Sequence, residues 1–317
     1  VSISNNIATY NSNIQGDDSF TYQATDGTNN SNVATVSITV SQKVFLFGSS
    51  GRQRFNDVIE TQDGGFVAVG LTNTNNGNDN DIYIVKTNTS GTIEWEHQIQ
   101  SLYEYTQVVE REVANAIIED SNGDFVITGQ TWGYATGGID GTPGGDGHSI
   151  FLTKIDQSGN ILWEVNDGAG QNDKNGFSNH WKGMKGNAIV NATGVEGEYF
   201  VFGGFYDGRR NAPWRHCALL TRYSSSGERY DNGGNPHYYP DSFYPIPDEF
   251  TGGIQSSDQS FIGITNQSGT GDHIVKFSDF DCQDHDVNGT LCDLEWDTYI
   301  DDSNGLYSII EHQNGDL

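Results

Sequence analysis

The chain is short of positive charge and of long apolar segments. Its 317 residues carry 15 Lys and Arg against 43 Asp and Glu, which gives a formal net charge of −28. Nucleic acids and anionic membranes attract cationic surfaces, so neither is expected as a partner. No run of about 18 apolar residues occurs, so no membrane insertion is expected. The acidity has a functional interpretation, which is cation binding or life in salty water. The alternative is a generic solubilising surface.

Helical periodicity and the common catalytic motifs are also missing. No segment spaces its apolar residues as a helix does, and there is no G-x-S-x-G elbow, phosphate loop or H-E-x-x-H motif. His216 and Cys217 are adjacent, but neighbours on a strand point to opposite faces and form no dyad. The chain has instead 40 Gly and 12% aromatic residues. This composition is typical of a turn-rich all-β protein and not of a disordered one.

One sequence pattern occurs four times after residue 54 and begins a fifth time. In each copy a turn precedes a strand rich in aromatic and β-branched residues, such as FVAVG at 66–70. Further strands lie before and after it, which gives four short strands per copy. A period of this size with several strands per repeat predicts a β-propeller. The anchor residues Phe66, Phe125, Phe200, Phe261 and Leu317 are separated by 59, 75, 61 and 56 residues.

The copies define the predicted domains. Residues 44–317 are expected to form an incomplete propeller, and seven blades are expected in the whole ring. Residues 1–40 lack the pattern and are expected to form a hairpin of a separate module, with a linker at 41–43. Because the chain stops within a copy, it is expected to be a piece of a longer polypeptide. The blades are predicted near residues 55–99, 111–167, 185–232 and 250–300, and from 305–317 onward.

Three kinds of position repeat within the copies, and each is expected to be structural. A Ser-Gly turn links the third and fourth strands, where Gly supplies a positive φ. The fourth strand runs into an aromatic residue that is expected to pack against the next blade. A cation near the end of the third strand is expected to pair with acidic neighbours. The positions are Gly91, Gly159 and Gly227; Trp95, Trp163, Tyr230 and Trp296; and Lys86, Lys154, Arg222 and Lys276.

Two resemblances follow from these segments. The strand GDDSFTY, the Asp26-Gly27 turn and the strand TVSITV resemble the end of bacterial cadherin-like or Ig-like repeats, which form stalks of surface proteins. The propeller copies resemble a family of secreted bacterial repeat proteins, many of them exported by the type IX system. That resemblance implies an extracellular location and a binding or scaffolding role, without one chemistry. It rests on Asp57, Asp63 to Phe66, Gly70, Asp81, Lys86, Gly91 and Trp95, and on Gly123, Phe125, Gly129, Lys154, Asp156, Gly159 and Trp163.

The fourth copy contains an EF-hand-type calcium pattern, D-x-[DN]-x-[DN]-G-x5-E. It is an insertion, because Lys86 and Trp95 are nine residues apart whereas Lys276 and Trp296 are twenty apart. Carboxylate, amide and carbonyl oxygens of such a loop converge on a hard cation. The alternative is an acidic, solvated loop that matches by chance. The predicted calcium ligands are Asp284, Asp286, Asn288, Thr290 and Glu295, which Asp279 and Asp281 could supplement.

Cys282 and Cys292 bracket this insertion. In an exported protein they are expected to form a disulfide, which would contribute roughly 2–3 kcal/mol for so short a loop. The alternatives are two reduced thiols or thiolate metal ligands. A zinc site would need more His or Cys than His285 provides. Cys217 is then left over as a small buried hydrophobic residue.

Several other segments are candidates for function or for structure. The turn Asp120 to Asp124 resembles a calcium turn, but a type I′ hairpin turn is the preferred interpretation. The long segments Gly133–His148, Gly168–Lys185 and Asn235–Phe250 interrupt the repeat, as functional loops of propellers do. The last is rich in Tyr and Pro, and it would either pack over a neighbouring blade or contact a ligand such as a sugar.

The sequence therefore predicts a non-enzymatic binding or adhesion module of a large extracellular or cell-surface bacterial protein. Its partner would be a protein or carbohydrate ligand. The alternative is a structural subunit of an extracellular assembly, in which copies of the chain bind each other. A carbohydrate-active propeller enzyme is the third interpretation, because spacing alone does not test for a catalytic carboxylate pair among so many acids.

Overall fold

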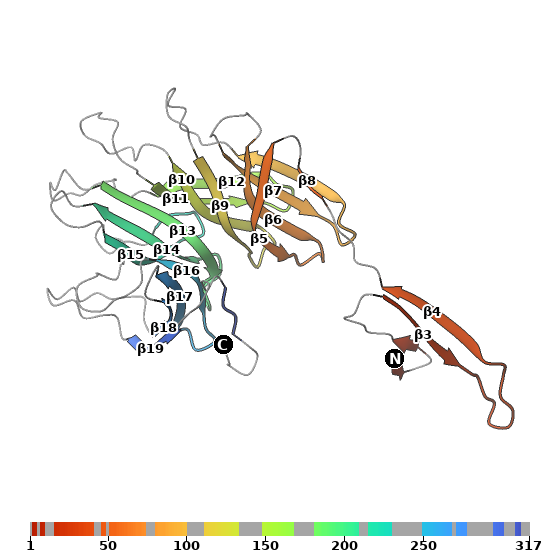
Figure 1. Ribbon diagram of the computed structural model, residues 1–317. Coiled ribbons are helices and arrows are strands. Elements are labelled where there is room, and N and C mark those ends of the chain that lie inside the picture. Colours follow the sequence, from red (N-terminus) through yellow and green to blue (C-terminus); the bar gives the residue numbers. More distant parts are fainter. Residues whose placement is uncertain are drawn as a thin grey trace. The chain divides into compact units, whose positions relative to one another are not determined.

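The computed structural model is all-β (Figure 1). The described residues contain strands β1 to β19, and none of them lies in a helix. No helix among them is therefore long and apolar enough to cross a membrane. The structure describes residues 2–4, 7–9, 16–40, 46–48, 51–73, 80–99, 111–132, 148–167, 181–208, 215–229, 249–267, 271–277, 294–300 and 308–311.

The chain divides into two compact units, Val1–Phe47 and Gly48–Leu317. The first unit has two antiparallel pairs, and the expected hairpin is the pair β3–β4. Phe20 lies opposite Val36 in this pair. These two side chains and Ile38 are half-buried, whereas the intervening Thr35, Ser37 and Thr39 are exposed. The alternation gives the hairpin one apolar face. The strands are β1 (Ser2–Ser4), β2 (Ile7–Thr9), β3 (Gly16–Tyr22) and β4 (Ala34–Val40).

The described residues of the second unit form four sheets, each an antiparallel meander in chain order. We call them the first to fourth repeat sheets, and the predicted strands of the copies are confirmed in them. The first is β5 (Arg52–Glu60), β6 (Phe66–Asn73), β7 (Asp81–Thr87) and β8 (Ile93–Ile99); the second is β9 (Arg111–Glu119), β10 (Phe125–Trp132), β11 (His148–Ile155) and β12 (Ile161–Asp167). The third is β13 (Trp181–Asn191), β14 (Tyr199–Gly208) and β15 (Arg215–Tyr223); the fourth is β16 (Phe250–Gln255), β17 (Phe261–Gln267), β18 (Gly271–Phe277) and β19 (Leu294–Ile300).

The predicted fourth strand of the third copy and the fifth copy are only partly covered by the description. Tyr230 lies outside the described residues, and Tyr223 and Arg229 form an isolated bridge before it. Residues 308–311 of the fifth copy are described but form no strand. The linker predicted at 41–43 also lies outside the described residues.

The strand register corrects the alignment of the third copy by one residue. Lys154 lies opposite Val126, and Arg222 lies opposite Phe200. Phe200 is therefore equivalent to Val126, and Tyr199 is equivalent to Phe125. Aromatic residues at both 199 and 200 make the two alignments indistinguishable in the sequence. Only the pairing with β15 separates them.

Each first strand has a β-bulge, and in the first three sheets the bulged side chain reaches the following sheet. The bulged residues are those skipped by the register, namely Asn56, Asn115, Asn187 and Thr251. Each Asn donates its amide hydrogen to a backbone carbonyl of the next sheet, at 2.7 Å for Ala114, 2.8 Å for Gly186 and 2.8 Å for Phe250. The irregularity is thus a device that joins sheets, in keeping with the way bulges redirect side chains.

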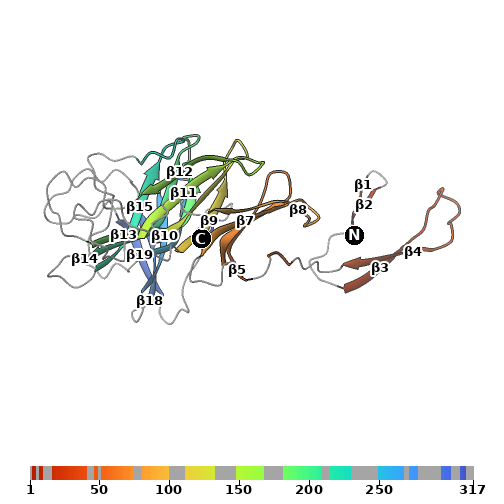
Figure 2. The same cartoon turned by 90° about the horizontal axis from the view of Figure 1, so that it is seen from above.

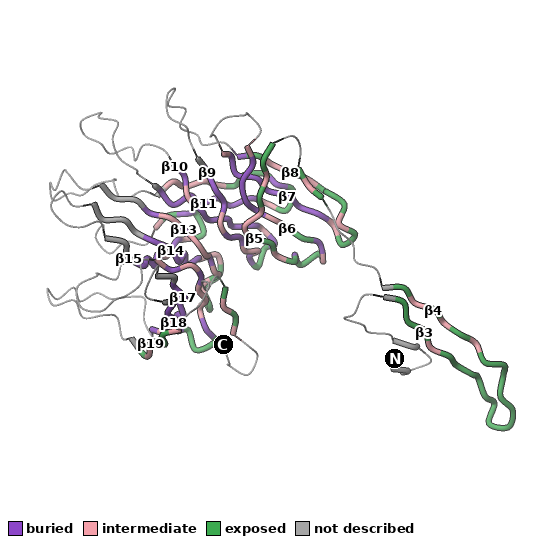
Figure 3. The backbone as a smooth tube through the Cα atoms, in the orientation of Figure 1, coloured by how far each residue is buried: buried purple, intermediate pink, exposed green. Residues whose placement is uncertain are grey.

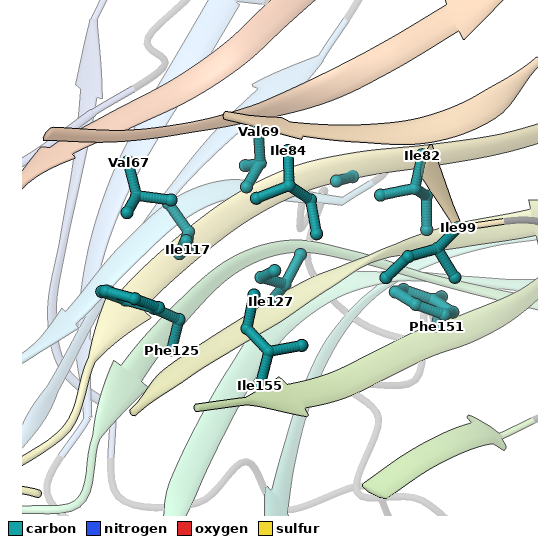
Figure 4. Close-up of a cluster of buried hydrophobic side chains, with 11 residues drawn as sticks. Val67, Val69, Ile82, Ile84, Ile99, Ile117, Phe125, Ile127, Phe151 and Ile155 are labelled. Carbon is teal, nitrogen blue, oxygen red and sulfur yellow. The ribbon is translucent and has the colours of Figure 1, made fainter. Parts of the chain in front are cut away.

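Apolar side chains fill the space between successive sheets. Those of the first and second sheets form one cluster. The outer strands β5 and β8 are more exposed than the inner strands β6 and β7 (Figure 3), and Figure 2 shows the sheets from above. Burying one such side chain contributes roughly 1.5–3 kcal/mol. Two similar clusters join the second sheet to the third and the third to the fourth. In the close-up, Val67, Val69, Ile82, Ile84 and Ile99 of the first sheet meet Ile117, Phe125, Ile127, Phe151 and Ile155 of the second (Figure 4).

A tryptophan on the fourth strand of the first sheet docks on the second sheet, and its equivalent on the second sheet docks on the third. Trp95 Nε1 donates to the carbonyl oxygen of Gln157 at 2.9 Å, and Trp163 Nε1 donates to that of Ser225 at 2.8 Å. Both acceptors lie beside the Ser-Gly turn of the following sheet. The indole of Trp95 also lies 6.2 Å from the ring of Phe125. The predicted packing role of these tryptophans is confirmed.

The Ser-Gly turn needs its glycine for two separate reasons. Gly159 has a φ of 84°, which L side chains avoid. A Cβ atom added there would also lie 2.2 Å from Nε2 of His97 and 3.2 Å from Cδ2 of Trp95. The turn therefore needs glycine both for its own conformation and for the close approach of the preceding sheet.

This contact predicts a difference between two glycine substitutions. Gly159→Ala should destabilise the protein more than Gly194→Ala, because Gly194 has a similar φ of 82° but nothing within 4 Å of its added Cβ. The left-handed conformation alone costs an alanine roughly 1–2 kcal/mol. Chemical denaturation of both variants measures the excess. Equal losses would contradict the proposed role of the turn in sheet docking.

The same contact can be tested from the tryptophan. Trp95→Phe should lower the free energy of unfolding by about 1 kcal/mol, because it removes the hydrogen bond to the Gln157 carbonyl.

Candidate functional site

The repeated cations lie on the third strands and reach the turns that join the first and second strands. Lys86 Nζ lies 2.8 Å from Asp63 Oδ2 and 2.9 Å from Glu94 Oε2. Lys276 Nζ lies 2.7 Å from Asp258 Oδ2. The expected ion pairs are confirmed at these two positions, and in both the acid is the third residue of the turn.

The other two cations pair with acids at different turn positions. Lys154 Nζ lies 2.7 Å from Asp120 Oδ2 and 3.1 Å from Asp124 Oδ2, at the first and last residues of the turn. Arg222 Nε donates to Glu198 Oε2 at 2.6 Å, again at the last residue. The cation keeps its place in every repeat sheet while its partner moves along the turn. This freedom is expected because a flexible cation can reach any carboxylate within the turn.

In the second sheet, the turn between the first and second strands holds one residue in the left-handed region. Gly123 has a φ of 79° and donates its N–H to the Asp120 carbonyl at 3.0 Å. A type I′ turn requires two residues with positive φ, and Gly123 is the only one described in this turn. The hairpin turn predicted at Asp120–Asp124 is therefore present, but its assignment as type I′ is wrong.

The calcium interpretation of this turn competes with contacts that Asp120 already makes. Asp120 Oδ1 accepts hydrogen bonds from the amides of Asn122 and Asp124, at 2.9 and 3.1 Å. Its Oδ2 accepts from Lys154 and, at 3.2 Å, from the Tyr199 hydroxyl of the third sheet. Both oxygens thus have donors within the protein. The carboxylate closes the turn and links two sheets.

The charges of these pairs are stabilised by their surroundings. Hydrogen bonds from Lys86 and Thr61 lower the pKa of Asp63 to about 2. Burial acts to raise the pKa of Asp120, but the bonds from Lys154 and the turn amides outweigh it and leave the pKa lowered. For Lys154, burial acts to lower the pKa, yet its two carboxylate partners raise it. Both partners stay ionised at neutral pH, which suits a structural clasp and not proton transfer.

Of the predicted calcium ligands, only Glu295 lies within the described part of the chain. Its Oε2 is 3.2 Å from Lys276 Nζ. It precedes Trp296 as Glu94 precedes Trp95, and Glu94 also pairs with the cation of its own sheet. Asp284, Asp286, Asn288, Thr290, Asp279 and Asp281 lie outside the described residues, as do Cys282 and Cys292. The residues that are described contain no group of three or more His, Cys, Asp or Glu that could hold a metal.

The two ends of the repeat sheets differ in their connections. The described turns of the repeat sheets join the first strand to the second or the third to the fourth, and so they lie at one end, which we call the turn end. The long sequence segments 101–110, 133–147 and 168–180 lie between strand ends at the opposite end, which we call the loop end. Segment 230–248 instead follows Arg229, which pairs with Tyr223 at the turn end, and precedes β16. The calcium-type insertion differs, because it lies between β18 and β19 at the turn end.

The described parts of the predicted loops belong to the sheets. His148 begins β11, and Trp181, Lys182 and Lys185 lie on β13. Phe250, the last residue of the Tyr/Pro-rich segment, is buried and lies edge to face on Phe202 with the ring centroids 5.6 Å apart. Packing is therefore the role of this one residue. Residues 235–248 lie outside the described part.

A polar hollow at the loop end, between the first and second sheets, was not anticipated from the sequence. It leaves no room for a water molecule, and it is lined by Ile82, Ile99, Glu112, Thr131, Phe151, Glu164 and Asn166. Burial raises the pKa of Glu164. Glu164 Oε1 and Asn166 Oδ1 have no hydrogen-bond partner among the described residues. The sequence carried one signal for this hollow. Glu112 lies three residues before the bulged Asn115, at the position where the third sheet has the fully buried Met184, so an acidic residue occupies a core position.

Comparison with known proteins gives no functional assignment. No family model matches the chain, and no curated protein matches it. Among solved structures, a protein of unknown function from Bacteroides caccae is similar, with 13% identity and a TM-score of 0.39. The match covers 78% of this chain and 62% of that protein's length.

The ion pairs predict unequal effects of the same substitution in two sheets. Lys154→Met should destabilise the protein by about 3 kcal/mol or more, since it leaves the carboxylate of Asp120, whose side chain is 1% exposed, buried without its cation. Lys276→Met should lower the free energy of unfolding by less than about 1 kcal/mol, because the side chain of Asp258 is 54% exposed and its carboxylate stays solvated. Urea denaturation of the two variants measures the difference. Equal losses would contradict the assignment of Lys154–Asp120 as the buried clasp.

The fourth turn predicts a stabilising substitution. Gln259 has a φ of 71° at the place where the first two turns have Gly64 and Gly123, and it is the only described non-glycine residue with a positive φ. Gln259→Gly should raise the free energy of unfolding by up to about 1 kcal/mol, because glycine removes the left-handed strain. Thermal unfolding checks this, with Gln255→Gly on the adjacent strand as a control that should be destabilising.

Proposed function

We propose that the repeat sheets are blades of a β-propeller. Each of the first three sheets buries a face against the next and donates a bulged Asn amide to it, and the first two also dock a tryptophan beside the following Ser-Gly turn. The first sheet exposes Phe66 by 42%, whereas its equivalents Phe125, Tyr199 and Phe261 are 1%, 0% and 3% exposed. A further blade against this face would bury Phe66 in the same way, as closure of a ring requires.

The fifth copy supports the same proposal. The backbone N–H of Ser257 donates to Glu311 Oε2 at 2.8 Å. In the first pair of sheets, the backbone N–H of Gln62 donates to Glu119 Oε2 at the same distance of 2.8 Å. Residues 308–311 therefore meet the fourth sheet as the first strand of a following blade would. The repeat continues beyond the fourth sheet in its contacts as well as in its sequence.

For the whole chain, the function we propose is that of a non-enzymatic binding or adhesion module of an extracellular or cell-surface bacterial protein. The observation that carries it is the separation of the two ends. The recurring ion pairs all serve the turns, so the repeated charged residues are used in structure. Three of the long segments, 101–110, 133–147 and 168–180, are flanked on both sides by strand ends at the loop end, where a repeat scaffold can vary its contacts without disturbing its packing.

Two further parts of the proposal concern the insertion of the fourth copy. Calcium bound by Asp284, Asp286, Asn288, Thr290 and Glu295 would stiffen this insertion, and a Cys282–Cys292 disulfide would close it. Calcium would have to compete with Lys276 for Glu295, since the two lie 3.2 Å apart. The Lys276 contact is partly exposed and therefore weak, so a divalent cation could displace it.

The second candidate function is a structural subunit of an extracellular assembly. It is favoured by the exposed apolar residues Ile161 and Leu162 on the outer strand of the second sheet, since such residues on edge strands promote association. A carbohydrate-active enzyme is the third. Glu112 and Glu164 both line the polar hollow, but this hollow lies in the packing between two sheets.

A calcium titration tests the metal proposal. We expect calcium to raise the midpoint of thermal unfolding, excess chelator to reverse the rise, and Asp284→Ala with Asp286→Ala to abolish it. Glu295→Gln serves as the matched variant, since it also loses the contact with Lys276 and so reveals any calcium-independent cost. A midpoint that calcium leaves unchanged in the parent chain would contradict the site.

A binding screen tests the proposed function itself. The chain should bind a protein or carbohydrate ligand on an array, and Tyr238→Ala with Tyr239→Ala in the Tyr/Pro-rich segment should weaken that binding at least tenfold, about 1.4 kcal/mol. Tyr299→Ala is the control, because Tyr299 is an exposed aromatic residue on β19. A chain that binds no ligand but sediments as an oligomer, and becomes monomeric with Leu162→Asp, would favour the structural subunit instead.

A further inference from the structure

We draw no further inference here: the strongest candidate, the polar hollow between the first and second repeat sheets with Glu112, Glu164 and Asn166 at its lining, is an acidic cluster without a second, independent feature that points to a ligand.

Discussion

The arrangement of the repeat sheets depends on covering the face of each sheet with the next one. A four-stranded sheet of this protein is apolar on both faces, so a single sheet exposed to water would lose the main contribution to its stability. The three clusters between successive sheets supply that contribution. The polar contacts follow from it. The bulged Asn amides meet part-buried backbone carbonyls, which would lose free energy without a donor. The Trp indole N–H groups meet carbonyls of exposed turn residues and so fix how the sheets dock.

The ion pairs show how a repeated structure tolerates changes in its sequence. The cation stays at one position of the third strand, because the register of the sheet directs it toward the turn. The carboxylate can come from the third residue of the turn, as with Asp63, or from the first and last, as with Asp120 and Asp124. A turn is short enough that each of these positions lies within reach of the same ammonium group. The electrostatic contact is thereby kept while the residues that make it change.

Much of the fold could be predicted because it is encoded locally. The alternation of FVAVG and its equivalents, the Ser-Gly turns and the period of the copies each report a strand or turn within a few residues. The structural role of Lys86, Lys154, Arg222 and Lys276 was also predictable, since four equivalent cations cannot all serve one active site. The third copy was misaligned by one residue, because Tyr199 and Phe200 satisfy the same local pattern. The type of the Asp120 turn was misassigned because its dihedral angles depend on the pairing of the flanking strands.

The sequence by itself determined the all-β class, the number and order of the strands in the first two copies, and the places of the turn glycines and cations, because these depend on propensity and periodicity along the chain. Only the tertiary structure decided which carboxylate meets each cation, which carbonyl receives Trp95 and Trp163, and that Glu112 and Glu164 share a hollow. Those contacts join residues from different strands or sheets. Their geometry is set by the packing of whole sheets, to which many side chains contribute at once, and no short segment carries that information.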